Sequence, residues 1–219
     1  MRKLSDKNEP SPPRFSIATL IQRGADISIA ARMDKPELIA CSLNWALVDE
    51  IDHLIKPSSE ADADWKLAQE KRVAQTKQLE EFCAHCRKFR NRVMAQLRFF
   101  AADNTALPPL PICKKTVARV ELVQDLFNLY LYCKNNASHL TPIFPDDTTM
   151  VTAYDNSNKL SELMADTVLR REALEEFQIV RNERCNRLYY LIKEVTAVAR
   201  LAFKKDDPRL KKYAYNHLY

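Results

Sequence analysis

The chain has 219 residues, a formal net charge of +5, 46% apolar residues and 29% charged residues, a composition typical of a globular rather than a disordered protein. It contains a single glycine, Gly24, where average usage would give about fifteen. Hairpin turns and phosphate-binding loops need glycine, whereas helices do not. The composition therefore predicts an all-α fold. It excludes a Walker loop, a dinucleotide-binding G-x-G-x-x-G motif and a kinase glycine-rich loop.

The first 32 residues divide into a polar segment and a short apolar one. Residues 1–14 are polar and rich in proline, so we expect a flexible arm. Residues 15–32 contain enough apolar residues for a short helix, which we expect to be interrupted near Gly24. We find no apolar segment typical of a signal peptide and no run of apolar residues long enough to cross a bilayer. Together with six scattered cysteines, which we expect to be reduced thiols, these features predict a cytoplasmic protein without a membrane partner.

The clearest predicted helix start lies at Asp34. Asp34 and Glu37 have the spacing of a capping box, and Pro36 suits a first helical turn. From there to Lys56 apolar residues repeat on two faces, which indicates burial on more than one side. We expect Pro57 to end this helix, because proline lacks a backbone donor and clashes with the preceding turn.

A second, longer helix is predicted from Ser58, because acidic residues follow it closely and suit a helix N-terminus. Its second half has apolar residues at three- and four-residue steps from Leu79 to Phe100. The proline-rich connector 108–111 follows it and separates it from the rest of the chain.

Two more helices are predicted after the connector. The first lies at about 116–135 and has apolar residues on two faces. The second begins near Thr148 and continues to Asp207. We expect a break in it at 155–158, because Asp, Asn and Ser side chains there compete for backbone hydrogen bonds.

This short-long-short-long order predicts an antiparallel bundle of four main helices, with residues 15–219 in one domain. The halves 34–107 and 112–207 are either two αα-hairpins that arose by duplication or amphipathic helices that resemble each other through periodicity alone. Short helices cannot cover long ones completely. We therefore expect the apolar stripes at 79–100 and 188–203 to be covered by the other long helix or by another subunit, as in a coiled-coil oligomer.

Charge is sorted along both long helices. Residues 49–64 carry six acids and one lysine, and residues 146–166 carry five acids and one lysine. Residues 87–98 carry five bases and no acid, and residues 200–212 carry six bases and two acids. An acidic start and a basic end complement the helix dipole. If the long helices were parallel, the bundle would have an acidic and a basic pole, suited to docking or head-to-tail assembly.

Two short motifs contain residue types that bind metals. Cys83, His85 and Cys86 combine two thiols with an imidazole, but no second paired motif completes a zinc site. Glu50 and His53 have the Glu-x-x-His spacing of a di-iron bundle, and no second such pair exists. We therefore predict no cofactor. These five residues remain the metal candidates of a third functional reading, a metal-dependent helical-bundle enzyme.

Catalytic motifs such as G-x-S-x-G are absent, and the four histidines form no catalytic constellation, so we expect no enzyme activity. The leading hypothesis is a non-catalytic helical scaffold or protein–protein interaction module, which associates with itself or with another protein through apolar helix stripes. The second hypothesis is nucleic-acid binding, since basic side chains contact phosphates and tyrosines stack on unpaired bases. The candidate interaction residues are Arg87, Lys88, Arg90, Arg92, Lys204, Lys205, Arg209, Lys211, Lys212, Tyr213 and Tyr215.

Overall fold

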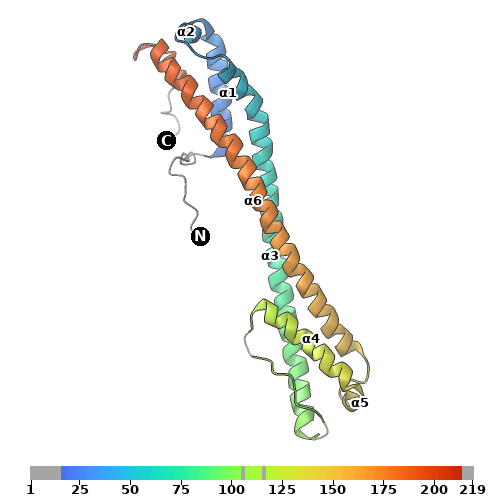
Figure 1. Cartoon of the computed structure of the whole chain (residues 1–219). Coiled ribbons are helices and arrows are strands. Elements are labelled where there is room, and N and C mark those ends of the chain that lie inside the picture. Colours follow the sequence, from blue (N-terminus) through green and yellow to red (C-terminus); the bar gives the residue numbers. More distant parts are fainter. Residues whose placement is uncertain (1–15, 105–106, 115–116, 214–219) are drawn as a thin grey trace, which may run out of the picture. The chain divides into compact units, whose positions relative to one another are not determined.

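A computed structural model describes residues 16–104, 107–114 and 117–213, and every regular element within them is a helix (Figure 1). The predicted all-α bundle is confirmed, whereas the predicted arm at 1–14 lies outside the described residues. The two long helices are α3 and α6, and the short main helix that precedes α3 is α1, not the helix predicted over 34–56. The helices are α1 (Ile17–Met33), α2 (Lys35–Ala40), α3 (Ala46–Ala102), α4 (Arg119–Asn135), α5 (Ala137–Leu140), α6 (Thr148–Ala202) and α7 (Leu210–Tyr213).

Helix α1 continues through Gly24, so the predicted interruption was wrong. The Ser16 hydroxyl caps the start of the helix by accepting a hydrogen bond of 3.2 Å from the backbone nitrogen of Thr19. Gly24 is buried, and a Cβ at this position would lie 3.1 Å from Cδ1 of Leu188. The glycine therefore allows α1 to approach α6 closely, which is a packing role and not a break in the helix.

The helix predicted to start at Asp34 is α2, and it is only six residues long. A turn follows in which Ser42 adopts a positive φ of 66°. Helix α3 then begins at Ala46, whose backbone nitrogen donates to Oδ1 of Asn44 at 3.1 Å. The side chain of Asp34 makes no capping hydrogen bond and instead accepts one from Tyr213. The capping-box pattern located a real helix start but predicted too long a helix.

Pro57 lies inside α3, so the predicted helix end at this residue was wrong. Proline in a helix interior costs about 3 kcal/mol, through the lost hydrogen bond and the clash with the preceding turn. Contacts with α6 offset part of this cost. Nη1 of Arg184 donates to the Pro57 carbonyl oxygen at 2.9 Å, and the ion pair of Arg181 with Asp62 joins the same two helices just beyond it. Tertiary packing therefore keeps α3 helical at a residue whose local preference is to end a helix.

Helix α6 is likewise continuous at 155–158, where a break was predicted wrongly. Asn156 and Ser157 are buried here, and the Ser157 hydroxyl donates to the carbonyl oxygen of Val123 at 3.0 Å. This polar side chain contacts α4 instead of disrupting its own helix. The helix predicted at about 116–135 is confirmed as α4, which begins at Arg119.

The chain divides into two compact units. Unit 1 comprises residues 1–69 and 173–219, and unit 2 comprises residues 70–172. Helices α3 and α6 each contribute one segment to each unit. Both units therefore combine segments from the two predicted halves.

In unit 1, α1 lies beside segments of α3 and α6 (Figure 1), and buried side chains of these helices form a hydrophobic core. Three contacts show that α3 and α6 are antiparallel here, because the residue numbers of the contacting positions increase along α3 and decrease along α6. The contacting pairs are Glu50 with Arg187, Pro57 with Arg184, and Asp62 with Arg181. The alternative of parallel long helices with one acidic and one basic pole is therefore wrong for this unit. Its acidic α3 segment instead faces arginines of α6.

Unit 2 has a second core, enclosed by α3, α4 and α6. Helix α4 runs in the same direction as α3, and α6 runs against α4. Glu80 pairs with Arg119 and Arg90 pairs with Asp125, so residue numbers increase together along α3 and α4. Val123 contacts Ser157 and Tyr130 contacts Tyr154, so residue numbers increase along α4 while they decrease along α6. The connector between α3 and α4 thus allows a parallel crossing, and a tight hairpin is not formed.

The two apolar stripes expected to need another long helix or subunit are largely buried within their own units. Leu79, Cys86 and Val93 lie in the core of unit 2, and Leu188 and Val195 lie in that of unit 1. The short helices α4 and α1 complete these cores. Of the two coverings expected for these stripes, the structure shows packing against helices of the same chain. The apolar side chains that remain exposed are the candidate docking surfaces.

Candidate interaction surfaces

The predicted basic residues of α3 separate into an exposed set and one buried arginine. Arg87, Lys88 and Arg92 are exposed. Arg90 is only 1% exposed, and its Nη1 donates to Oδ2 of Asp125 at 2.7 Å inside unit 2. Arg90 therefore joins α3 to α4 and is not presented at the surface.

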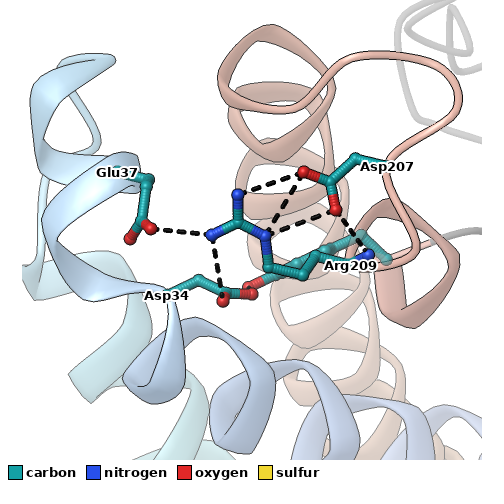
Figure 2. A network of polar contacts seen from close by, with 5 residues as sticks. Asp34, Glu37, Asp207 and Arg209 are labelled. Atoms are coloured by element: carbon teal, nitrogen blue, oxygen red, sulfur yellow. Dashed lines mark hydrogen bonds and ion pairs between the residues drawn. The ribbon is translucent and has the colours of Figure 1, made fainter.

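Arg209 is the centre of a polar network that ties the C-terminal segment to α2 (Figure 2). Its Nη1 donates to Oε1 of Glu37 at 2.7 Å and lies 4.0 Å from Oδ1 of Asp34, and its Nη2 donates to Oδ2 of Asp207 at 3.0 Å. The guanidinium also lies over the ring of Phe203, 4.3 Å from the centroid. Arg209 therefore stabilises unit 1 through contacts within the chain.

Tyr213 is a core residue of unit 1 and is fully buried. Its hydroxyl donates to Oδ2 of Asp34 at 3.0 Å, and its ring stacks on Phe203 with 6.0 Å between centroids. Burial first, and then the hydrogen bond to Asp34, raise the pKa of Tyr213. A ring in this position cannot stack on a nucleic-acid base. Tyr215 lies outside the described residues.

Four predicted interaction residues near the C-terminus are exposed: Lys204, Lys205, Lys211 and Lys212. Lys211 and Lys212 belong to α7, which packs against α1. Because Tyr213 and Arg209 anchor this short helix on either side of the two lysines, their backbone position is fixed by the fold of unit 1.

Lys211 and Lys212 meet α1 at a groove on the surface of unit 1, which we call the basic groove. Its volume is about 510 Å³. Two of its apolar side chains are strongly exposed, Ile29 at 57% and Met33 at 68%. The lining residues are Arg23, Asp26, Ile29, Ala30, Met33, Lys211 and Lys212.

A second apolar surface lies on unit 2, where α4 and α6 contact each other. The rings of Phe127 and Tyr130 have centroids 5.8 Å apart, and those of Tyr130 and Tyr154 are 4.9 Å apart. Leu131 lies one helical turn after Phe127, and Val151 lies three residues before Tyr154, so both extend the same surface. Phe127, Leu131, Val151 and Tyr154 are each at least 36% exposed. We call Phe127, Tyr130, Leu131, Val151 and Tyr154 together the aromatic patch.

The thiols of the predicted metal motif are buried in the core of unit 2. Cys83 and Cys86 are both part of that core, and burial raises the pKa of Cys86 to about 12. His85 is exposed, and its ring stacks on Phe82. The imidazole and the buried thiols therefore point to different environments.

Glu50 forms a two-point ion pair with Arg187, with both nitrogen–oxygen distances at 2.6 Å. This hydrogen bonding lowers the pKa of Glu50. His53 is exposed on the same helix. No group of three or more His, Cys, Asp or Glu side chains that could hold a metal ion is found among the described residues.

Known proteins give no direct guide to these surfaces. No protein-family model, curated protein or solved structure matches this chain. Within the part of the chain that the structure describes, no helix is both long and apolar enough to cross a membrane. The function must therefore be inferred from the chemistry of the surfaces themselves.

The aromatic patch was missed as a site by sequence reasoning, although a signal for it was present. The segment 116–135 has apolar residues on two faces of its helix. Leu122, Leu126 and Leu129 form the face that is buried in unit 2. Phe127 lies on the other face and stays exposed. A second apolar face that the core does not use is the feature that locates the patch.

Proposed function

We propose that this chain is a non-catalytic helical interaction module that binds another protein through the aromatic patch of unit 2. The observation that carries the proposal is the aromatic cluster in which the exposed Phe127 and Tyr154 flank the half-buried Tyr130. Aromatic side chains are enriched at the centres of protein interfaces, because they bury a large area at a small cost in side-chain entropy.

The patch is supported by rigid elements, which favours binding. Its two helices are joined by the hydrogen bond between Ser157 and Val123, and α4 is held to α3 by the ion pair of Arg90 with Asp125. A surface that is already ordered loses little conformational entropy when a partner docks. Tyrosine hydroxyls at its edge also allow hydrogen bonds to a polar interface rim.

The test compares partners of the wild-type chain with those of a patch variant. Tagged wild type, Phe127→Ser/Tyr154→Ser and a control variant, Phe99→Ser, are expressed in cells that make this protein, and bound proteins are quantified by mass spectrometry. Phe99 is 79% exposed on α3 and lies outside the patch. We expect proteins that bind wild type and the control to be depleted at least about tenfold from the patch variant, a loss of at least about 1.4 kcal/mol.

Mass photometry of the three purified proteins tests self-association through the same surface. A dimer of wild type and control that becomes monomeric in the patch variant also supports the proposal. An identical set of bound proteins for all three chains, together with an unchanged oligomeric state, would overturn it.

The exposed lysines near the C-terminus favour nucleic-acid binding as a second candidate function. Lys204, Lys205, Lys211 and Lys212 lie within one short segment and are accessible to phosphates. Fluorescence anisotropy with a mixed-sequence single-stranded RNA tests it. Binding at about 50 mM salt that weakens steeply by about 200 mM would support this function, and absence of binding at the lower concentration would exclude it.

A further inference from the structure

The basic groove of unit 1 shares no residue with the aromatic patch and has a different chemistry. Most of its lining comes from one face of α1, because Asp26, Ile29, Ala30 and Met33 lie at helical positions i, i+3, i+4 and i+7. Ala30 is buried at 3% exposure, whereas Ile29 and Met33 remain largely exposed. The groove thus has an apolar interior that no other part of the described chain covers.

The dimensions of the groove suit one face of a helix. From Arg23 to Met33, α1 advances about 15 Å at the rise of an α-helix, which corresponds to roughly three turns of a partner helix. Apolar side chains spaced by three and four residues on such a helix would contact Ile29 and Met33 in succession. This is the geometry by which amphipathic helices bind grooves in other proteins.

The rim of the groove is predominantly cationic. Arg23, Lys211 and Lys212 line it together with one carboxylate, that of Asp26. Oδ1 of Asp26 accepts a hydrogen bond of 3.0 Å from Nε2 of Gln22. A partner that carries acidic side chains beside its apolar face is therefore complementary to the groove in both charge and polarity.

We infer that the basic groove binds an acidic amphipathic helix of a partner protein. This inference rests on the proposed function as an interaction module and names the chemistry of a partner for a separate surface. The phosphates of a nucleic acid would contact only the cationic rim, and the residues that line the groove include no aromatic ring on which an unpaired base could stack. An acidic helix uses both the apolar interior and the cationic rim.

The probe is a fluorescein-labelled, capped helical peptide of about 18 residues, with leucine at i, i+3, i+4 and i+7 and glutamate beside this face. A matched peptide carries lysine in place of every glutamate. Binding to the full chain is measured by fluorescence anisotropy, and the ε-methyl NMR signal of Met33, assigned through Met33→Leu, reports contact with the groove.

We expect the acidic peptide to bind and to shift the Met33 signal, and the lysine peptide to bind at least about tenfold more weakly. Lys211→Glu/Lys212→Glu should weaken binding of the acidic peptide by at least about tenfold and strengthen binding of the lysine peptide. A misfolded variant could not produce this reversal of preference. The matched control Lys204→Glu/Lys205→Glu makes the same charge change outside the groove and should leave both affinities within about twofold.

Three results would overturn the inference: equal affinity for the two peptides, equal loss in the groove and control variants, or binding without a shift of the Met33 signal. Stronger binding to vesicles that contain phosphatidylserine than to the acidic peptide would assign the groove to a lipid surface instead. Because none of these measurements involves Phe127 or Tyr154, a negative result here leaves the proposed function of the aromatic patch intact.

Discussion

The hydroxyl of Tyr213 donates a hydrogen bond of 3.0 Å to Asp34, a residue 179 positions away in the sequence. Both side chains are buried in unit 1, at 0% and 5% exposure. The bond fixes α7 against the junction of α1 and α2, and Arg209 reinforces it through Glu37 (Figure 2). The last described helix therefore contributes to the stability of unit 1, although it is only four residues long.

Replacing Tyr213 with phenylalanine should destabilise the protein with little change in shape. The Asp34 carboxylate would lose a buried hydrogen bond, which typically costs about 1–3 kcal/mol. We expect a lower urea midpoint in unfolding followed by circular dichroism. Tyr190→Phe is the control, because Tyr190 is an exposed tyrosine of α6. An equal midpoint for Tyr213→Phe and the control would show that the buried bond contributes nothing.

Tyr213 should also make stability depend on pH in the alkaline range. Burial and the hydrogen bond to Asp34 raise its pKa in the folded protein, so folding favours the neutral phenol. The contribution of Tyr213 to the free energy of unfolding is complete below about pH 10, the pKa of tyrosine in the unfolded chain. It is lost as the pH rises from there through the higher pKa of the folded protein. We expect the difference in urea midpoint between wild type and Tyr213→Phe to shrink from pH 8 to about pH 11. A constant or growing difference would contradict this linkage.

The buried ion pair of Arg90 with Asp125 predicts opposite outcomes for single and double replacement. Arg90→Met leaves the Asp125 carboxylate inside unit 2 without its cation, which should cost about 3–5 kcal/mol. Arg90→Met/Asp125→Leu removes both charges, so its stability should return to within about 2 kcal/mol of wild type or exceed it. Urea unfolding of the three proteins measures both effects. A double variant as unstable as the single one would show that the pair is not the source of the loss.

The sequence predicted some features of this fold and not others, for physical reasons. The helical class follows from the scarcity of glycine, a property of the whole chain. Local propensity, however, misplaced the ends of helices at Pro57 and at 155–158, because contacts from Arg184 and Val123, distant in the sequence, decide the structure there. Such contacts have no trace in the local pattern.

The candidate site was predicted in part. Lys211 and Lys212 were selected for their charge, and they do line a groove. Arg90 was selected for the same reason and is buried. Its helical position could have shown this, since it lies four residues after the core residue Cys86 and on the same face. The position of Arg90 on the core face of α3 therefore decides its burial, and its charge does not.

Pro57→Ala should stabilise the protein. Alanine restores the backbone donor and removes the clash with the preceding turn, while the carbonyl oxygen that accepts from Arg184 is kept. We expect a gain of about 1–3 kcal/mol in urea unfolding, after allowing for the greater freedom of the unfolded chain. Pro36→Ala is the matched control, because Pro36 lies in the first turn of α2, where no donor is needed. A loss of stability in Pro57→Ala would indicate that α3 requires the proline geometry for its packing.

Gly24 should tolerate only a small side chain, because α1 approaches α6 closely at this position. In Gly24→Ala the new Cβ would lie 3.1 Å from Cδ1 of Leu188, and this overlap offsets a gain in helix propensity of about 1 kcal/mol. We expect its urea midpoint to stay near that of wild type. Gly24→Val overfills the same space and should lose about 1–3 kcal/mol or more.

A double-mutant cycle tests whether Leu188 is the side chain that limits the space at Gly24. Leu188→Ala alone leaves a cavity and should cost about 2–5 kcal/mol. In Gly24→Val/Leu188→Ala the valine can occupy part of that cavity, so the combined loss should be smaller than the sum of the two single losses by at least about 0.5 kcal/mol. Strictly additive losses in urea unfolding would mean that the two residues do not compete for the same volume, and the close packing of α1 on α6 would need another explanation.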